Sequence, residues 1–86
     1  MEFEFDVDKS EANRMKHGID FVRAQALWDD PDRLQVPART EGEPRWMMIG
    51  RIGDHHWSAV FMVRDGKTRI ISVRRSRPME EQRYEE

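Results

Sequence analysis

Two tight-turn signals divide the second half of the chain into three segments and restrict its fold more than any other feature. Gly53-Asp54 fits a two-residue turn with glycine first, and Asp65-Gly66 fits a type I′ turn. The apolar segments that flank these turns are residues 45–52, 55–64 and 67–75. Because two-residue turns join antiparallel neighbours, the sequence predicts a meander of consecutive hairpins.

The turn lengths also predict which residues face each other. With two residues in each turn, Ile52 pairs with His55 and Arg64 pairs with Lys67. One face then carries the rows Trp46–Phe61–Ile70, Met48–Ala59–Ser72 and Gly50–Trp57–Arg74. The other carries Arg45–Met62–Arg69, Met47–Val60–Ile71, Ile49–Ser58–Val73 and Arg51–His56–Arg75. Neither face is purely polar, so we expect helices on one face and the C-terminal segment, a partner or a ligand on the other. Helices of the protein itself on both faces are the alternative.

The N-terminal residues predict a strand followed by a helix. Apolar residues alternate with acidic ones at Phe3, Phe5 and Val7, as in a strand with one buried face. The segment Asp8-Lys9-Ser10-Glu11 has the spacing of a capping box, with Asp8 as the cap. It predicts a helix from about Lys9 to His17, which Gly18 would end in the left-handed conformation.

A second helix and a short strand are expected next. Asp20 can cap a helix whose apolar residues at helical spacing are Phe21, Ala24, Leu27 and Trp28. Asp29-Asp30-Pro31 should end it, and residues 33–38 are expected to form a short strand that Pro37 places at a sheet edge. Thr40 to Pro44 is expected to be a loop. The predicted fold class is α+β: strand, helix, helix, an antiparallel meander of three to four strands and a short C-terminal helix, in one domain of residues 1–86.

Charge is unevenly distributed, although the formal net charge is only −2. Residues 1–43 carry −5, residues 44–79 carry +6, and the last seven residues carry −3. Of the 15 basic residues 12 are arginine, whose planar fork suits phosphate and carboxylate groups. This segregation favours an anionic partner for the basic segment, and a scattered solvated surface is the plainer alternative.

Composition excludes several classes of protein. The absence of cysteine excludes disulfides, a thiol nucleophile and cysteine metal sites. No apolar run approaches the roughly 20 residues of a membrane span, and the acidic N-terminus is unlike a signal peptide, so we expect a cytoplasmic protein. His55 and His56 would point to opposite faces of a strand, so we expect no metal site and no cofactor.

Two strings near opposite ends of the chain resemble one family of bacterial proteins. They are Lys16-His17-Gly18-Ile19-Asp20-Phe21 and Arg69-Ile70-Ile71-Ser72 with Arg74. Further matches are Phe5-Asp6, Trp28-Asp29-Asp30-Pro31, Arg45-Trp46 and Glu81 to Tyr84. The order of elements resembles the RelE-like ribonuclease toxins of toxin–antitoxin modules, and the strings narrow the resemblance to the BrnT family.

This resemblance implies a toxin that cleaves RNA and inhibits translation. Its partner would be a BrnA-type antitoxin with a ribbon-helix-helix part, in a complex that the family suggests is a heterotetramer. The toxin would contact DNA only through the antitoxin, and together they would repress their own operon. A non-catalytic co-repressor on the same scaffold is the alternative function.

Metal-independent RNA cleavage needs a base, an acid and a fixed cation. Arg74 and Arg77 are the first candidates for the cation, followed by Arg45, because guanidinium forks bind phosphate bidentately. Surface salt bridges with the neighbouring glutamates are the alternative role of each arginine.

The candidate acids and bases are His17, Glu80 and Tyr84. His17 ends the first predicted helix, where the helix dipole favours the protonated form, and its alternative role is to contact the last carbonyls. Glu80 would otherwise be solvated, and Tyr84 would otherwise pack its ring on the sheet. The aromatic set Trp46, Trp57 and Phe61 could stack RNA bases or anchor the antitoxin, but core packing is the expected role.

Overall fold

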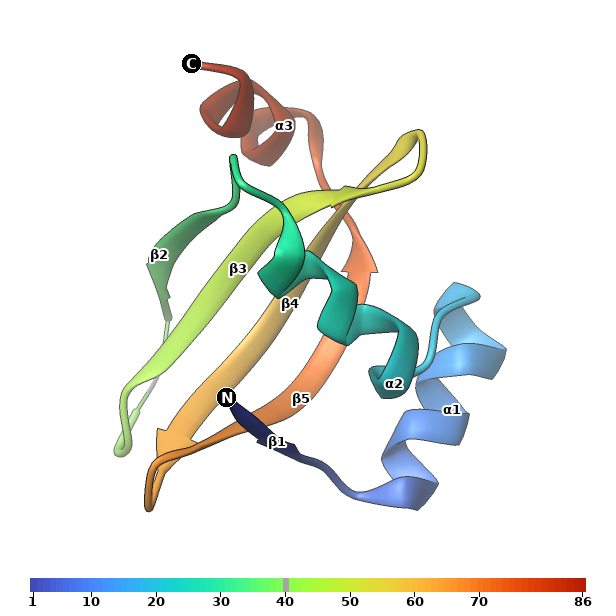
Figure 1. Ribbon diagram of the computed structural model, residues 1–86, viewed down its shortest axis with the longest axis vertical. Coiled ribbons are helices and arrows are strands. Elements are labelled where there is room, and N and C mark those ends of the chain that lie inside the picture. Colours follow the sequence, from blue (N-terminus) through green and yellow to red (C-terminus); the bar gives the residue numbers. More distant parts are fainter. Residues whose placement is uncertain (40) are drawn as a thin grey trace.

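The computed structural model describes residues 1–39 and 41–86, so Thr40 of the predicted loop lies outside the described residues. A sheet with the strand order β1-β5-β4-β3-β2 forms its centre (Figure 1). The elements in chain order are β1 Glu2–Glu4, α1 Val7–His17, α2 Phe21–Ala24, the 3-10 helix η1 Gln25–Asp29, β2 Leu34–Ala38, β3 Arg45–Ile52, β4 His55–Arg64, β5 Lys67–Arg75 and α3 Pro78–Glu85. Strands β2 to β5 form an antiparallel meander, and β1 pairs in parallel with β5. The predicted α+β fold class is confirmed.

Both predicted hairpin turns are present. Ile52 pairs with His55, and Arg64 pairs with Lys67. Asp65 and Gly66 have φ angles of 52° and 76°, the positive values that a type I′ turn requires at both central positions. The spacing of the two turn signals therefore predicted where β3 ends, where β4 begins and ends, and where β5 begins.

The predicted rows fail beyond a β-bulge in β5. Phe61 pairs with Ile70 as expected, but Val60 pairs with Ser72, which leaves Ile71 as an extra residue. The pairs that replace the predicted ones are Ala59 with Val73, Ser58 with Arg74, and Trp57 with Arg75. The rows Met48–Ala59–Ser72, Gly50–Trp57–Arg74, Met47–Val60–Ile71, Ile49–Ser58–Val73 and Arg51–His56–Arg75 are therefore wrong in their β5 member. One extra residue exchanges the faces of a strand, because side chains alternate along it.

The bulge places Val73 in the core and Arg74 on the opposite face. Side chains from α2, η1 and three strands form the core on the first face: Ile19, Phe21, Ala24, Leu27, Met48, Ala59, Phe61, Ile70 and Val73. Figure 1 shows α2 in front of the sheet and α3 beyond one end of it. The N-terminal helices thus cover the face that carries Phe61, whereas the other face carries Met47, Val60 and Arg74. Core packing is confirmed for Phe61, and Trp46 and Trp57 lie half-buried at the margin of the same core.

Two expectations for the N-terminus were wrong. Strand β1 ends at Glu4, and Val7 is a helical residue with 73% of its surface exposed. The cap of α1 is Asp6, whose carboxylate accepts the Lys9 N–H at 3.1 Å, rather than Asp8. Asp6 has the extended backbone of an N-cap, so it begins the helix before the predicted capping box. The other end agrees with prediction, because Gly18 is left-handed at a φ of 82°.

Asn13 joins α1 to the middle of β5. Strand β1 pairs with β5 only over Lys67–Arg69, so the edge of β5 needs other partners further along. The buried Asn13 side chain supplies them: its amide nitrogen donates to the Val73 carbonyl at 2.9 Å, and its oxygen accepts the Val73 N–H at 3.2 Å. The same amide nitrogen donates to the Ile19 carbonyl at 2.8 Å. One side chain thus fixes the helix against the strand that carries Arg74.

None of the helices in the described ranges is long and apolar enough to cross a membrane.

Candidate active site beneath the C-terminal helix

Helix α3 meets the sheet through polar side chains. None of its residues is buried, and Met79 has 74% of its surface exposed. The residues that bond to other elements are Glu80, Glu81, Tyr84 and Glu85, which share one side of the helix. Hydrogen bonds and ion pairs therefore hold this helix in place, and hydrophobic burial contributes little.

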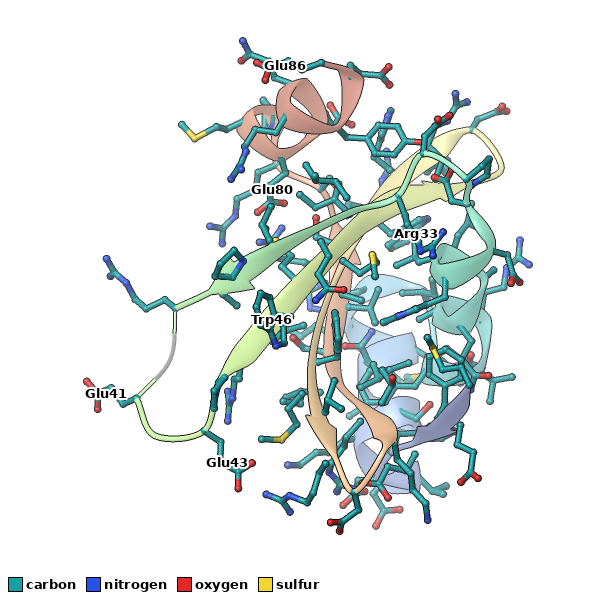
Figure 2. The ribbon with its side chains drawn as sticks, turned by 60° about the vertical axis from the view of Figure 1, so that its left-hand side comes forward. Arg33, Glu41, Glu43, Trp46, Glu80 and Glu86 are labelled. Carbon is teal, nitrogen blue, oxygen red and sulfur yellow. The ribbon has the colours of Figure 1, made fainter. Side chains whose placement is uncertain are left out.

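Arg74 and Glu80 form a two-pronged ion pair at the start of α3. The Arg74 nitrogens Nη1 and Nη2 lie 2.8 and 2.7 Å from the two carboxylate oxygens of Glu80. Glu80 also accepts the Ser58 hydroxyl at 2.8 Å and the Arg77 N–H at 2.9 Å. Figure 2 shows Glu80 between the helix and the strands. The Arg74 hydrogen bond, and then those from Arg77 and Ser58, outweigh the effect of burial and lower the pKa of Glu80 to about 2.

We expect protonation of Glu80 to lower the free energy of unfolding in acid. Its pKa in the folded state, about 2, lies below the ordinary value of 4.5, so the carboxylate stabilises the fold above pH 4.5. This contribution is lost as the pH falls from 4.5 to about 2. Urea unfolding at several pH values, compared with Glu80→Gln, measures it. Equal pH dependence in both proteins over this window would contradict the expectation.

Tyr84 connects the C-terminal part of α3 to the loop after η1. Its hydroxyl donates to Asp30 at 2.7 Å, and the same Asp30 oxygen accepts the Arg51 N–H at 2.8 Å. Burial and this hydrogen bond raise the pKa of Tyr84 to about 12. Burial also acts to raise the pKa of Asp30, but the hydrogen bonds it accepts outweigh burial and lower it. An open depression of about 380 Å³ adjoins the pair, lined by Ala26, Asp29, Asp30, Pro31, Asp32, Arg51, Gly53 and Tyr84.

His56 on β4 belongs to the same cluster, although sequence reasoning considered it only as half of an unsupported metal pair. Its Nε2 lies 2.9 Å from Glu85, and its Nδ1 lies 3.3 Å from Glu81. The ring also meets Tyr84 edge-to-face, with the centroids 5.2 Å apart. The predicted pairing of His56 with Arg51 is confirmed, but the sequence held no signal that α3 would lie over this pair.

The remaining candidates lie at different distances from this cluster. Arg77 precedes α3 and is exposed, and in the described part of the chain its guanidinium makes no ion pair. Arg45 begins β3 on the same sheet face as Arg74. The β3 residue in the row of Arg74 is Ile49, and Arg45 lies four residues before it, or about 13 Å along the strand. His17 is the last residue of α1, and no hydrogen bond within residues 1–39 and 41–86 connects it to α3. The structure thus gathers Arg74, Arg77, Glu80 and Tyr84 and separates Arg45 and His17 from them.

This cluster contains a fixed cation and a protonated hydroxyl, but its carboxylate Glu80 is a weak base. Arg74 keeps its charge, and Glu80 raises its pKa further. Glu80 with a pKa of about 2 is a weak base, and Tyr84 with a pKa of about 12 stays protonated near neutrality. No group of three histidine or acidic side chains suited to a metal ion occurs among the described residues.

A family model described as "Ribonuclease toxin, BrnT, of type II toxin-antitoxin system" matches residues 5–80. The matched range includes Arg74, Arg77 and Glu80, and it ends before Tyr84. A search of curated proteins found no match.

Proposed function

We propose, because the chain belongs to the BrnT family of ribonuclease toxins of type II toxin–antitoxin systems, that it cleaves RNA at the cluster beneath α3. The observation that carries this proposal is the fork of Arg74. The guanidinium lies on the sheet face that the N-terminal helices do not cover, and its side chain is 25% exposed. Two carboxylate oxygens already occupy both of its prongs, which is the geometry that a phosphate would use.

In the proposed reaction an RNA phosphate replaces Glu80 on Arg74. The fixed guanidinium then stabilises the charge that develops on the phosphate as the ribose 2′-hydroxyl attacks it. Arg77, exposed beside this position, is a second cation for the same strand. Arg45 lies on the same face further along β3 and would bind the RNA backbone rather than the reacting phosphate. Tyr84 and Glu80 would act by positioning α3, and His17 is a distant candidate.

A type II system implies a protein antitoxin as partner. We propose a BrnA-type antitoxin with a ribbon-helix-helix part, which forms a heterotetramer with the toxin and represses their operon. It would neutralise the toxin by covering the sheet face of Met47, Val60 and Arg74. The partly exposed apolar side chains there and the arginines Arg45 and Arg74 suit a partner segment with apolar and acidic side chains.

The purified chain should fragment RNA and stop translation in a cell-free reaction without added metal. We expect products with 2′,3′-cyclic phosphate and 5′-hydroxyl ends, at a rate that EDTA leaves unchanged. Addition of the purified antitoxin before the RNA should abolish cleavage. Cleavage that EDTA stops would contradict the metal-independent mechanism.

Intact RNA with a folded, soluble chain would instead support the second candidate function. A non-catalytic co-repressor is favoured by one observation: neither Glu80 nor Tyr84 has a pKa suited to proton transfer near neutrality. In that case the chain should strengthen the binding of operator DNA by the antitoxin without affecting RNA.

A further inference from the structure

Both ring nitrogens of His56 face carboxylates. Nδ1 lies 3.3 Å from an oxygen of Glu81, and Nε2 lies 2.9 Å from an oxygen of Glu85. Nε2 is at hydrogen-bond distance from Glu85, whereas Nδ1 is at ion-pair distance from Glu81. The carboxylates of α3 therefore fix the orientation of the ring and direct Nε2 toward the exposed end of the helix.

The ring also has neighbours on α3 and β3. From α3, Tyr84 contacts the ring edge-to-face and directs its hydroxyl to Asp30. From β3, Arg51 is the cross-strand neighbour, and its guanidinium nitrogen lies 3.5 Å from the Gly53 carbonyl. The His56 side chain is 17% exposed, so its two carboxylate contacts are partly shielded from water. Two negative charges therefore face the imidazole, against one nearby positive charge on Arg51.

His56 also lies beside the residues that hold Glu80. It is two residues from Ser58 on β4, so both side chains lie on the same sheet face, about 7 Å apart along the strand. Ser58 pairs with Arg74 across the strands, and both bond to Glu80. A phosphate on the Arg74 fork would thus lie on the same sheet face as the imidazole, beside the neighbouring row of the sheet.

We propose that His56 is the catalytic acid of this site, an assignment that rests on the proposed ribonuclease function. The ribose 2′-oxygen forms a bond to phosphorus and releases its proton to water. The bond between phosphorus and the 5′-oxygen breaks, and that oxygen takes the proton from Nε2 of His56. The imidazole then regains a proton from solvent, so the products are a 2′,3′-cyclic phosphate and a 5′-hydroxyl.

Glu81 and Glu85 have different tasks in this assignment. The Glu81 carboxylate lies 3.3 Å from Nδ1, so Glu81 is a positioning residue that fixes the ring orientation. Glu85 is the last residue of α3, and its side chain is 60% exposed. Its carboxylate occupies the position that the leaving oxygen would take on Nε2, and a small movement of this exposed side chain would admit the substrate.

Two RNA substrates of one sequence test the assignment. The second carries sulfur in place of the scissile 5′-oxygen, and a thiolate leaves without the help of an acid. We expect His56→Gln to lower the single-turnover rate on ordinary RNA by about 100-fold and on the sulfur-containing RNA by less than about threefold.

His55→Gln is the matched control, because the neighbouring His55 is exposed and its side chain makes no hydrogen bond or ion pair with any described residue. It should retain the parental rate on both substrates. Glu85→Gln loosens α3 but keeps the imidazole, so any loss of rate should be the same on both substrates. Equal losses on both substrates in His56→Gln would overturn the acid role and leave His56 as a clamp for α3. A parent that cleaves neither RNA would overturn the proposed function together with this assignment.

Discussion

Arg74→Ala is expected to lower the rate of RNA cleavage by about 1,000-fold and to relieve the growth arrest caused by expression of the chain alone. The guanidinium is the fixed charge closest to the proposed phosphate position. Water in its place would supply neither the positive charge nor the two parallel hydrogen bonds. Arg74→Lys should retain part of the activity, because lysine keeps the charge but loses the fork. Single-turnover cleavage and growth after brief induction measure both effects.

Arg64→Ala is the matched control for this substitution. Arg64 also forms an ion pair with a glutamate, Glu43, but the pair is at least half exposed and lies at the turn between β4 and β5. We expect normal cleavage from this variant. Unchanged arrest in each of the Arg45, Arg74 and Arg77 alanine variants would contradict the site assignment and would leave the fold unaffected.

Asn13→Leu is expected to lower the free energy of unfolding by about 3 kcal/mol. Three hydrogen bonds are lost together, and the N–H and carbonyl of the fully buried Val73 lose the partner that α1 gives them. The leucine cannot supply a donor or an acceptor to the edge of β5. Urea unfolding at neutral pH measures the change.

Met15→Ala is the control for this second substitution, because Met15 lies on the same helix with 74% of its surface exposed. Its effect should stay within about 0.5 kcal/mol. A loss below about 1 kcal/mol for Asn13→Leu would show that α1 is not fixed to β5 through this amide.

Local signals in the sequence were sufficient for most of the fold. The two turns predicted the pairing of Ile52 with His55 and of Arg64 with Lys67, and Asp20 and Gly18 marked helix ends as expected. The bulge at Ile71 could not be predicted, because a glycine or a break in the apolar run would have been needed to mark it. Asp6 was missed as the cap of α1 because the alternation of apolar and acidic residues, which is typical of a strand, continues to Val7.

The candidate site was predictable where its residues are close in sequence. Arg74, Arg77, Glu80 and Tyr84 lie within eleven positions, so a strand followed by a helix brings them together. His56 and Asp30 join them only because α3 folds back over the end of the sheet. That placement depends on side-chain pairs between distant segments, which a single sequence does not reveal.

The extra residue at Ile71 gives this strand a tolerance that genetic variants would reveal. Loss of this one codon would remove the bulge and leave Ser72, Val73 and Arg74 opposite Val60, Ala59 and Ser58, as they are now. The Val73 side chain would stay in the core and the Arg74 guanidinium on the opposite face, because side chains alternate along a regular strand. A cell should therefore not escape the toxin through a one-codon deletion here, and escape variants that remain folded should arise in this strand by substitution.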